Sequence, residues 1–130
     1  MEEFLAEAGE RHPEIWLRDG FISIKGHSIL RDPKKFYKPV IQWVKSYVKD
    51  PPRQTIVTLQ IDFSDSRSTK TIFEILKTLA ACQNTNHGIE MIFNWVYIKE
   101  DGAIRELGEF FESKLNVSFI YFEEISHISQ

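Results

Sequence analysis

Several residue types are rare in this sequence, and their rarity argues against particular classes of protein. Among its 130 residues there is one cysteine, Cys82, so an internal disulfide is excluded and a reducing compartment is favoured. Six glycines, none of them in a GxGxxG or P-loop pattern, argue against a phosphate-cradling loop. No apolar run approaches the roughly 20 residues that span a bilayer, and the acidic start MEEFLAEAGE does not resemble a signal peptide. We therefore expect a cytoplasmic protein that does not bind a membrane.

A basic excess is also missing. The formal net charge is -3, which disfavours a general nucleic-acid-binding protein. The charge is nevertheless uneven, because residues 31–53 hold seven Lys or Arg against two acids, and residues 98–130 hold seven acids against three bases. Two solvated faces of opposite sign and a charged docking face both fit this distribution.

Hydrophobic residues at 42% and aromatic residues at 13% are sufficient for one packed domain. We predict an N-terminal tail over residues 1–12, a single domain over 13–125 and a C-terminal tail over 126–130. Within the domain, strands are expected at Glu14–Arg18, Phe21–Lys25, Ile56–Phe63, Ile89–Ile98 and Val117–Phe122. Helices are expected to start at Asp32-Pro33, at the hydroxyl-rich turn near Ser66, and at Asp101.

The predicted order is β-β-α-β-α-β-α-β, an α/β fold with a mixed, mostly parallel sheet and helices packed on it. The first two strands form a hairpin, for which Asp19-Gly20 suggests a type I′ turn. The run Ile89–Ile98 is almost wholly apolar, which is typical of a strand covered on both faces.

The most informative segment is Thr55–Leu79, TIVTLQIDFSDSRSTKTIFEILKTL, an apolar strand that leads through hydroxyl-bearing residues into an amphipathic helix. Ser64, Ser66, Ser68 and Thr69 crowd the expected helix start, where backbone N–H groups are unpaired and the dipole is positive. A phosphate on one of these hydroxyls would be stabilised there, although turn and capping serines have the same pattern.

Other chemistry has less support. The four histidines are scattered without metal-ligand spacing, no catalytic motif is present, and we expect neither a cofactor nor a metal site nor enzymatic activity. Asp62 and Asp65 follow a strand as the phospho-accepting aspartate of receiver domains does, but the acidic pair and lysine that receivers need are missing. Trp95 and Tyr97 alternate along a strand and could line a small-ligand pocket or simply fill the core.

Three segments together resemble the SiaC family of bacterial regulatory phosphoproteins. Phe21–Val48, FISIKGHSILRDPKKFYKPVIQWVKSYV, resembles the family's Gly-x-Ser step followed by Phe-Tyr-x-Pro and a tryptophan two turns on. Asp62–Leu79, DFSDSRSTKTIFEILKTL, resembles its Tyr-Phe-Asn-Thr-Ser-Ser-Ser-Lys turn and apolar helix. Asn94–Phe111, NWVYIKEDGAIRELGEFF, resembles its Asn-Trp-Tyr-Tyr, acidic run and Gly-Glu before an aromatic helix.

The resemblance implies a fold similar to anti-sigma-factor-antagonist (STAS) domains and a role in partner switching. The family's phosphorylated threonine aligns with Ser66, and Asp65 stands where the family has asparagine. Arg67 interrupts the serine run. We expect Ser66 to be the phosphorylation site, and its neighbours to form the switch and docking region (Ser64, Asp65, Arg67, Ser68, Thr69 and Lys70).

The resemblance also implies three protein partners. The unphosphorylated form would bind and activate a diguanylate cyclase in cyclic-di-GMP signalling and biofilm control. A cognate serine/threonine kinase would phosphorylate the protein, and a metal-dependent phosphatase would reset it. A STAS-like small-ligand-binding or anti-sigma-antagonist module is the alternative.

Overall fold

Three aspartates set where the helices begin. Asp32, Asp65 and Asp101 are N-caps, and each carboxylate accepts a hydrogen bond from the backbone N–H three residues later. This bond satisfies one of the N–H groups that a helix start leaves unpaired.

The computed structural model describes residues 1–125. Its elements in that range are β1 (Phe4–Ala6), β2 (Glu14–Arg18), β3 (Phe21–Ser28), α1 (Pro33–Tyr47), β4 (Gln54–Ser64), α2 (Ser66–Thr85), β5 (Glu90–Ile98), α3 (Gly102–Leu115) and β6 (Phe119–Glu124).

The six strands form one sheet in the order β1-β2-β3-β4-β5-β6, so every strand lies beside its neighbour in the sequence. Strands β3 to β6 are parallel, whereas β1 and β2 pair antiparallel. Each parallel step contains one helix, as such connections require. The predicted α/β fold, its N-terminal hairpin and its mostly parallel sheet are therefore confirmed.

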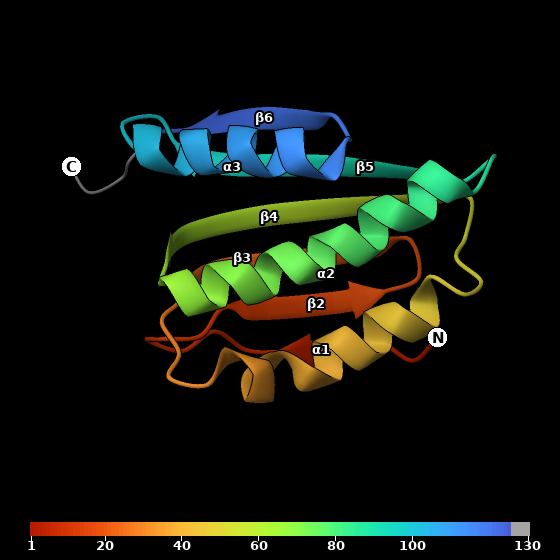
Figure 1. The fold of residues 1–130 in the computed structure, drawn as a ribbon. Coiled ribbons are helices and arrows are strands. Elements are labelled where there is room, and N and C mark those ends of the chain that lie inside the picture. The colour runs from red at the N-terminus through yellow and green to blue at the C-terminus, as the bar shows by residue number, and fades with distance from the viewer. Residues whose placement is uncertain (126–130) are drawn as a thin grey trace.

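All three helices cover the same face of the sheet, and the core lies between them and the strands (Figure 1). The alternation along β5 shows this directly, because Met91, Phe93, Trp95 and Tyr97 are buried while the residues between them are only partly buried. The prediction that Ile89–Ile98 is covered on both faces is thus wrong. An apolar side chain on the open face does not require a covering layer, since half-buried positions between neighbouring strands tolerate it.

The N-terminal segment is not a tail as predicted. Phe4–Ala6 forms β1 and pairs with β2, and Trp43 Nε1 donates a hydrogen bond to the carbonyl of Glu2 at 2.8 Å. A three-residue strand has too short a pattern to be found in the sequence. At the other end, the last strand extends to Glu124, beyond the predicted limit at Phe122. The predicted tail over residues 126–130 lies outside the described residues.

The turn of the hairpin also differs from the prediction. Gly20 has a φ of 79°, but Asp19 does not have a positive φ, so the turn is not type I′. Tertiary contacts decide its shape, because the Gly20 N–H donates to Tyr47 Oη at 2.8 Å and the Gly20 carbonyl accepts from Ile56 N at 3.0 Å.

Among the described helices, none combines the length and the apolar character needed to cross a membrane.

Candidate functional site

Ser66 is the first residue of α2 and its side chain is exposed. It follows directly after Asp65, which separates the end of β4 from the helix. The Ser68 and Thr69 N–H groups donate to Asp65, which leaves the N–H groups of Ser66 and Arg67 without an acceptor in the described part of the chain. An exposed hydroxyl therefore lies at a positive helix end, where a phosphate group would be accessible to solvent and stabilised by the free N–H groups.

Asp65 fixes this turn to the rest of the domain. Its Oδ1 accepts from Ser68 N at 2.8 Å, its Oδ2 accepts from Leu30 N at 3.0 Å, and its own N–H donates to the Ser28 carbonyl at 3.0 Å. Desolvation of the carboxylate acts to raise its pKa, but the N–H donors and the positive charge of Arg67 outweigh it and lower the pKa. The residue before the hydroxyl is thus a carboxylate that stays ionised.

The other predicted switch residues do not all reach the surface. Arg67 and Lys70 are exposed, and Arg67 Nη1 donates to the Arg31 carbonyl at 2.9 Å. Ser64 and Thr69 are half-buried and their hydroxyls are hydrogen-bonded to each other. Ser68, in contrast, is fully buried at 0% exposure, so a partner cannot touch it directly.

A buried hydrogen bond, which was not predicted from the sequence, lies beneath the turn that contains Ser64, Asp65 and Ser66, which we call the switch turn. Ser28 and Tyr37 are both fully buried, and their hydroxyls are hydrogen-bonded at 2.7 Å. Burial is the main cause that raises the pKa of Tyr37 to about 12. Gly26 has a φ of 128° at a register shift in β3, next to Pro13, and this irregularity precedes Ser28. The Gly-x-Ser step and the Phe-Tyr-x-Pro segment therefore meet through one buried hydrogen bond that supports the switch turn.

The structure places Trp95 and Tyr97, from the third segment, in the core. Trp95 and Tyr97 are 2% and 5% exposed, the Trp95 indole is stacked on Phe119, and its Nε1 donates to the Ile104 carbonyl at 3.0 Å. A Cβ on Gly108 would lie 2.7 Å from the indole, which explains why glycine stands here. Of the two alternatives for Trp95 and Tyr97, a ligand pocket and core packing, the structure supports core packing, because neighbouring side chains fill the space around both rings.

Receiver-like chemistry also lacks a basis in the fold. The sheet follows the sequence order and carries its helices on one face, whereas a receiver sheet has a switched strand order and helices on both faces. Asp62 is exposed and Asp65 is committed to capping. Within residues 1–125, no three His, Cys, Asp or Glu side chains are grouped so that they could hold a metal ion.

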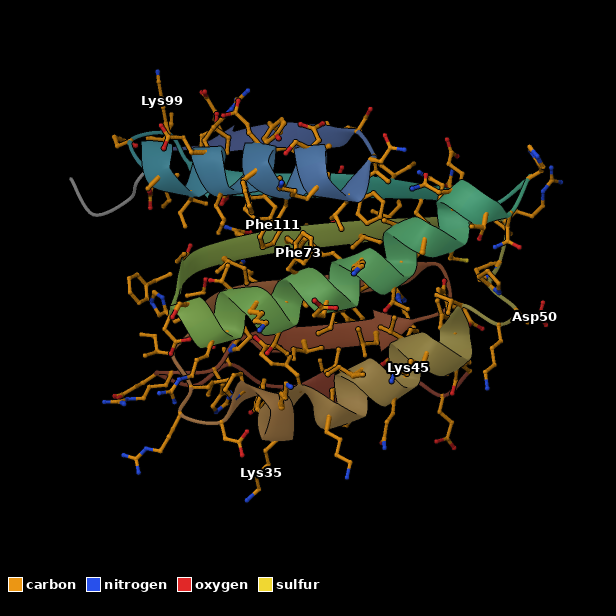
Figure 2. All side chains as sticks on the ribbon, viewed as in Figure 1. Lys35, Lys45, Asp50, Phe73, Lys99 and Phe111 are labelled. Atoms are coloured by element: carbon orange, nitrogen blue, oxygen red, sulfur yellow. The ribbon has the colours of Figure 1, made fainter. Side chains whose placement is uncertain are left out.

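Exposed aromatic side chains near Ser66 were not predicted from the sequence. Phe63, the second-last residue of β4, is 52% exposed, and Phe110 on α3 is 54% exposed. A groove of about 640 Å³ is lined by Ser66, Lys70 and Phe110 among others. Phe73 and Phe111 close it between α2 and α3, with ring centroids 5.1 Å apart (Figure 2). Exposed aromatic side chains are common at protein interfaces, so this surface is suited to a protein partner.

The fold and the site together define a small α/β domain with an exposed hydroxyl at a helix start. The family described as SiaC family regulatory phosphoprotein matches residues 6–124, and the chain belongs to this family. Among curated proteins, none matches the sequence.

Solved structures of similar fold come from Pseudomonas aeruginosa. SiaC has 22% identity and a TM-score of 0.80, with 97% of this chain and 100% of that chain covered. Apo-SiaC has 19% identity and a TM-score of 0.75, with 95% and 99% covered. A chain from the complex of diguanylate cyclase SiaD with its activator SiaC has 21% identity and a TM-score of 0.78, also with 95% and 99% covered. These similarities show the fold.

Proposed function

We propose that this protein is a phosphorylation-switched adaptor whose unphosphorylated form binds and activates a diguanylate cyclase. A serine/threonine kinase phosphorylates Ser66 and a metal-dependent phosphatase removes the phosphate. The protein acts in the cytoplasm, by binding and not by catalysis. The observation that carries this proposal is the exposed hydroxyl of Ser66 at the start of α2. The resemblance of residues 62–79 to the family's turn motif assigns the phosphorylation site to the same residue.

The switch is local because Ser66 is already exposed. Phosphorylation adds about −1.5 to −2 charges and three acceptor oxygens without moving a core side chain. In the free protein these oxygens remain hydrated. Against a partner surface they would have to lose that water next to the ionised Asp65, at a cost of several kcal/mol. A loss of about 4 kcal/mol weakens binding roughly a thousandfold.

The departures from the family pattern fit this mechanism. Serine accepts phosphate as threonine does, so the chemistry is retained. Arg67 lies next to the site and offers the phosphate a cation, although its guanidinium also donates to the Arg31 carbonyl. We infer that Asp65 and Arg67 tune the charge at the site, while Ser68 acts only through the packing of the helix.

The experiment has two arms. The first incubates the wild type, Ser66→Ala and the matched control Ser46→Ala with the cognate kinase and measures intact mass. We expect one phosphate on the wild type and on Ser46→Ala, and none on Ser66→Ala. Phosphate retained by Ser66→Ala would show that another residue is the phosphorylation site.

The second arm measures cyclic-di-GMP production by diguanylate cyclases of the source genome. Each is assayed with the unphosphorylated chain and with chain that carries genetically encoded phosphoserine at position 66. We expect one cyclase to be activated by the first form only. Equal activity with both forms, or no activation of any cyclase, would reject the adaptor role.

A further inference from the structure

We propose that the groove between α1 and α2 binds an acidic, amphipathic helix of the partner protein. This inference rests on the proposed function and names the surface that the partner uses. The groove has a volume of about 830 Å³. Its basic lining residues are Arg31, Lys34, Lys38, Lys45, Arg67 and Lys70, and its acidic ones are Asp32 and Glu74. We call this surface the α1–α2 groove.

The protein itself neutralises the positive charge of the α1–α2 groove only in part, because six basic residues line it against two acidic ones. The ion pairs within residues 1–125 are Met1 with Asp19 and Arg105 with Glu109, and neither involves a residue of the groove. All six basic side chains are on exposed residues. Unpaired cations that converge on one concave surface produce a local positive potential, although the whole chain has a net charge of -3.

The floor of the groove is apolar. Ile41 is half-buried in its lining, and an adjoining hollow of about 180 Å³ adds the buried side chains of Val44 and Ile75, beside Lys45, Glu74 and Thr78. An apolar floor with a basic rim matches a helix that has one apolar face and carboxylates on both sides of it. Lys34 to Lys45 spans about 16 Å along α1, which is the length of about three helical turns.

Two other polyanions fit less well. A nucleic-acid backbone presents phosphates but no apolar face for Ile41. An anionic bilayer is flat, whereas this surface is concave between two helices. A protein helix satisfies both the charge and the shape.

The groove also explains how a phosphate on Ser66 would control the partner. Arg67 and Lys70 belong to the groove and lie one and four residues after Ser66, so within about one helical turn of it. The distance along the helix from Ser66 to these two residues is therefore shorter than the Debye length of about 8 Å at physiological ionic strength. A phosphate there lowers the positive potential at this end of the groove and competes with the partner's carboxylates for the same two cations.

The test compares two charge reversals of equal size. Lys38→Glu with Lys45→Glu changes the groove, and Lys35→Glu with Lys49→Glu is the matched control. Figure 2 shows Lys35 pointing away from α2, on the outer side of α1. Both doubles change the net charge by the same amount, and thermal melts check that both are folded. Binding is measured to the cyclase identified by the activation assay, at 50 and 300 mM NaCl.

We expect the groove double to bind at least about tenfold more weakly, and the control double within about twofold of the wild type. Affinity of the wild type should fall at the higher salt, and zero-length carbodiimide coupling should join groove lysines to acidic residues of a helix in the cyclase. Equal loss in both doubles, or coupling only outside the groove, would overturn the groove assignment while leaving the adaptor role intact. Binding to phosphatidylglycerol vesicles that the groove double alone abolishes would overturn it in favour of a membrane. Failure of the wild type to bind any cyclase would reject both proposals.

Discussion

Asp65 provides the most direct test of how the switch turn is built. Replacing it with alanine removes the acceptor for Ser68 N and the acceptor for Leu30 N, at 2.8 and 3.0 Å in the structure. Loss of an N-cap costs about 0.5–2 kcal/mol, and loss of a further hydrogen bond about 0.5–1.5 kcal/mol. Because Asp65 is half-buried, we expect a total near 2 kcal/mol, which lowers the Tm by roughly 7 °C for a chain of this size.

Asp65→Asn separates the charge from the hydrogen bonds. The amide keeps one oxygen as acceptor for one of the two N–H groups, so we expect a loss of about 1 kcal/mol. The pH dependence has a definite sign, because the folded-state pKa of Asp65 is lowered. Its contribution is fully present above the unfolded pKa of about 3.9 and is lost as the pH falls through the folded value.

Urea unfolding followed by circular dichroism measures these differences at pH 7 and at intervals down to pH 3. The gap between the wild type and Asp65→Asn should narrow below pH 4. A cost of less than about 0.5 kcal/mol for Asp65→Ala at pH 7 would show that these two hydrogen bonds do not stabilise the fold. A gap between wild type and Asp65→Asn that stayed constant over the whole pH range would refute the electrostatic part.

Three further predictions concern the core. Gly108→Ala should destabilise the fold by about 1–3 kcal/mol in urea unfolding, because the new Cβ would lie 2.7 Å from the Trp95 ring. Tyr37→Phe should cost about 1–2 kcal/mol by leaving the buried Ser28 hydroxyl unpaired. Since the folded pKa of Tyr37 is about 12, its stabilisation is lost as the pH rises from 10 through 12, and ultraviolet titration should show Tyr37→Phe lacking this phase. The buried thiol of Cys82, whose pKa is raised by desolvation, should react with a disulfide reagent only after unfolding, and rapid labelling of the native protein would contradict its placement.

Local signals predicted the helices well. Asp32 before Pro33 was expected to begin a helix, and it is the N-cap of α1. Asp101 was expected to begin another, and it is the N-cap of α3. Capping depends on a bond between residues three positions apart, so the sequence contains all the information that it needs.

Features that depend on contacts between residues far apart in the sequence were predicted less well than the helix caps. Strand β1 forms because β2 offers it an edge, and its three residues alone carry no pattern. The identity of the covered face of β5 depends on where the helices pack, which an apolar run does not specify. Trp95 and Tyr97 were consistent with either a pocket or a core, and only their neighbours, Phe119 and Glu123, show that they belong to the core.

At the proposed switch, the order of residues along the chain is enough to place a hydroxyl-bearing residue, Ser66, between an apolar strand and an amphipathic helix. That follows from periodicity and capping, which act over a few residues. Packing of the helix on the sheet leaves Ser66 exposed and buries Ser68, two residues on, in the core. It also brought the basic residues of α1 beside Arg67 and Lys70 of α2 to form one groove. Burial and local potential are sums over neighbours from separate parts of the chain, so they exist only once the helices have packed on the sheet.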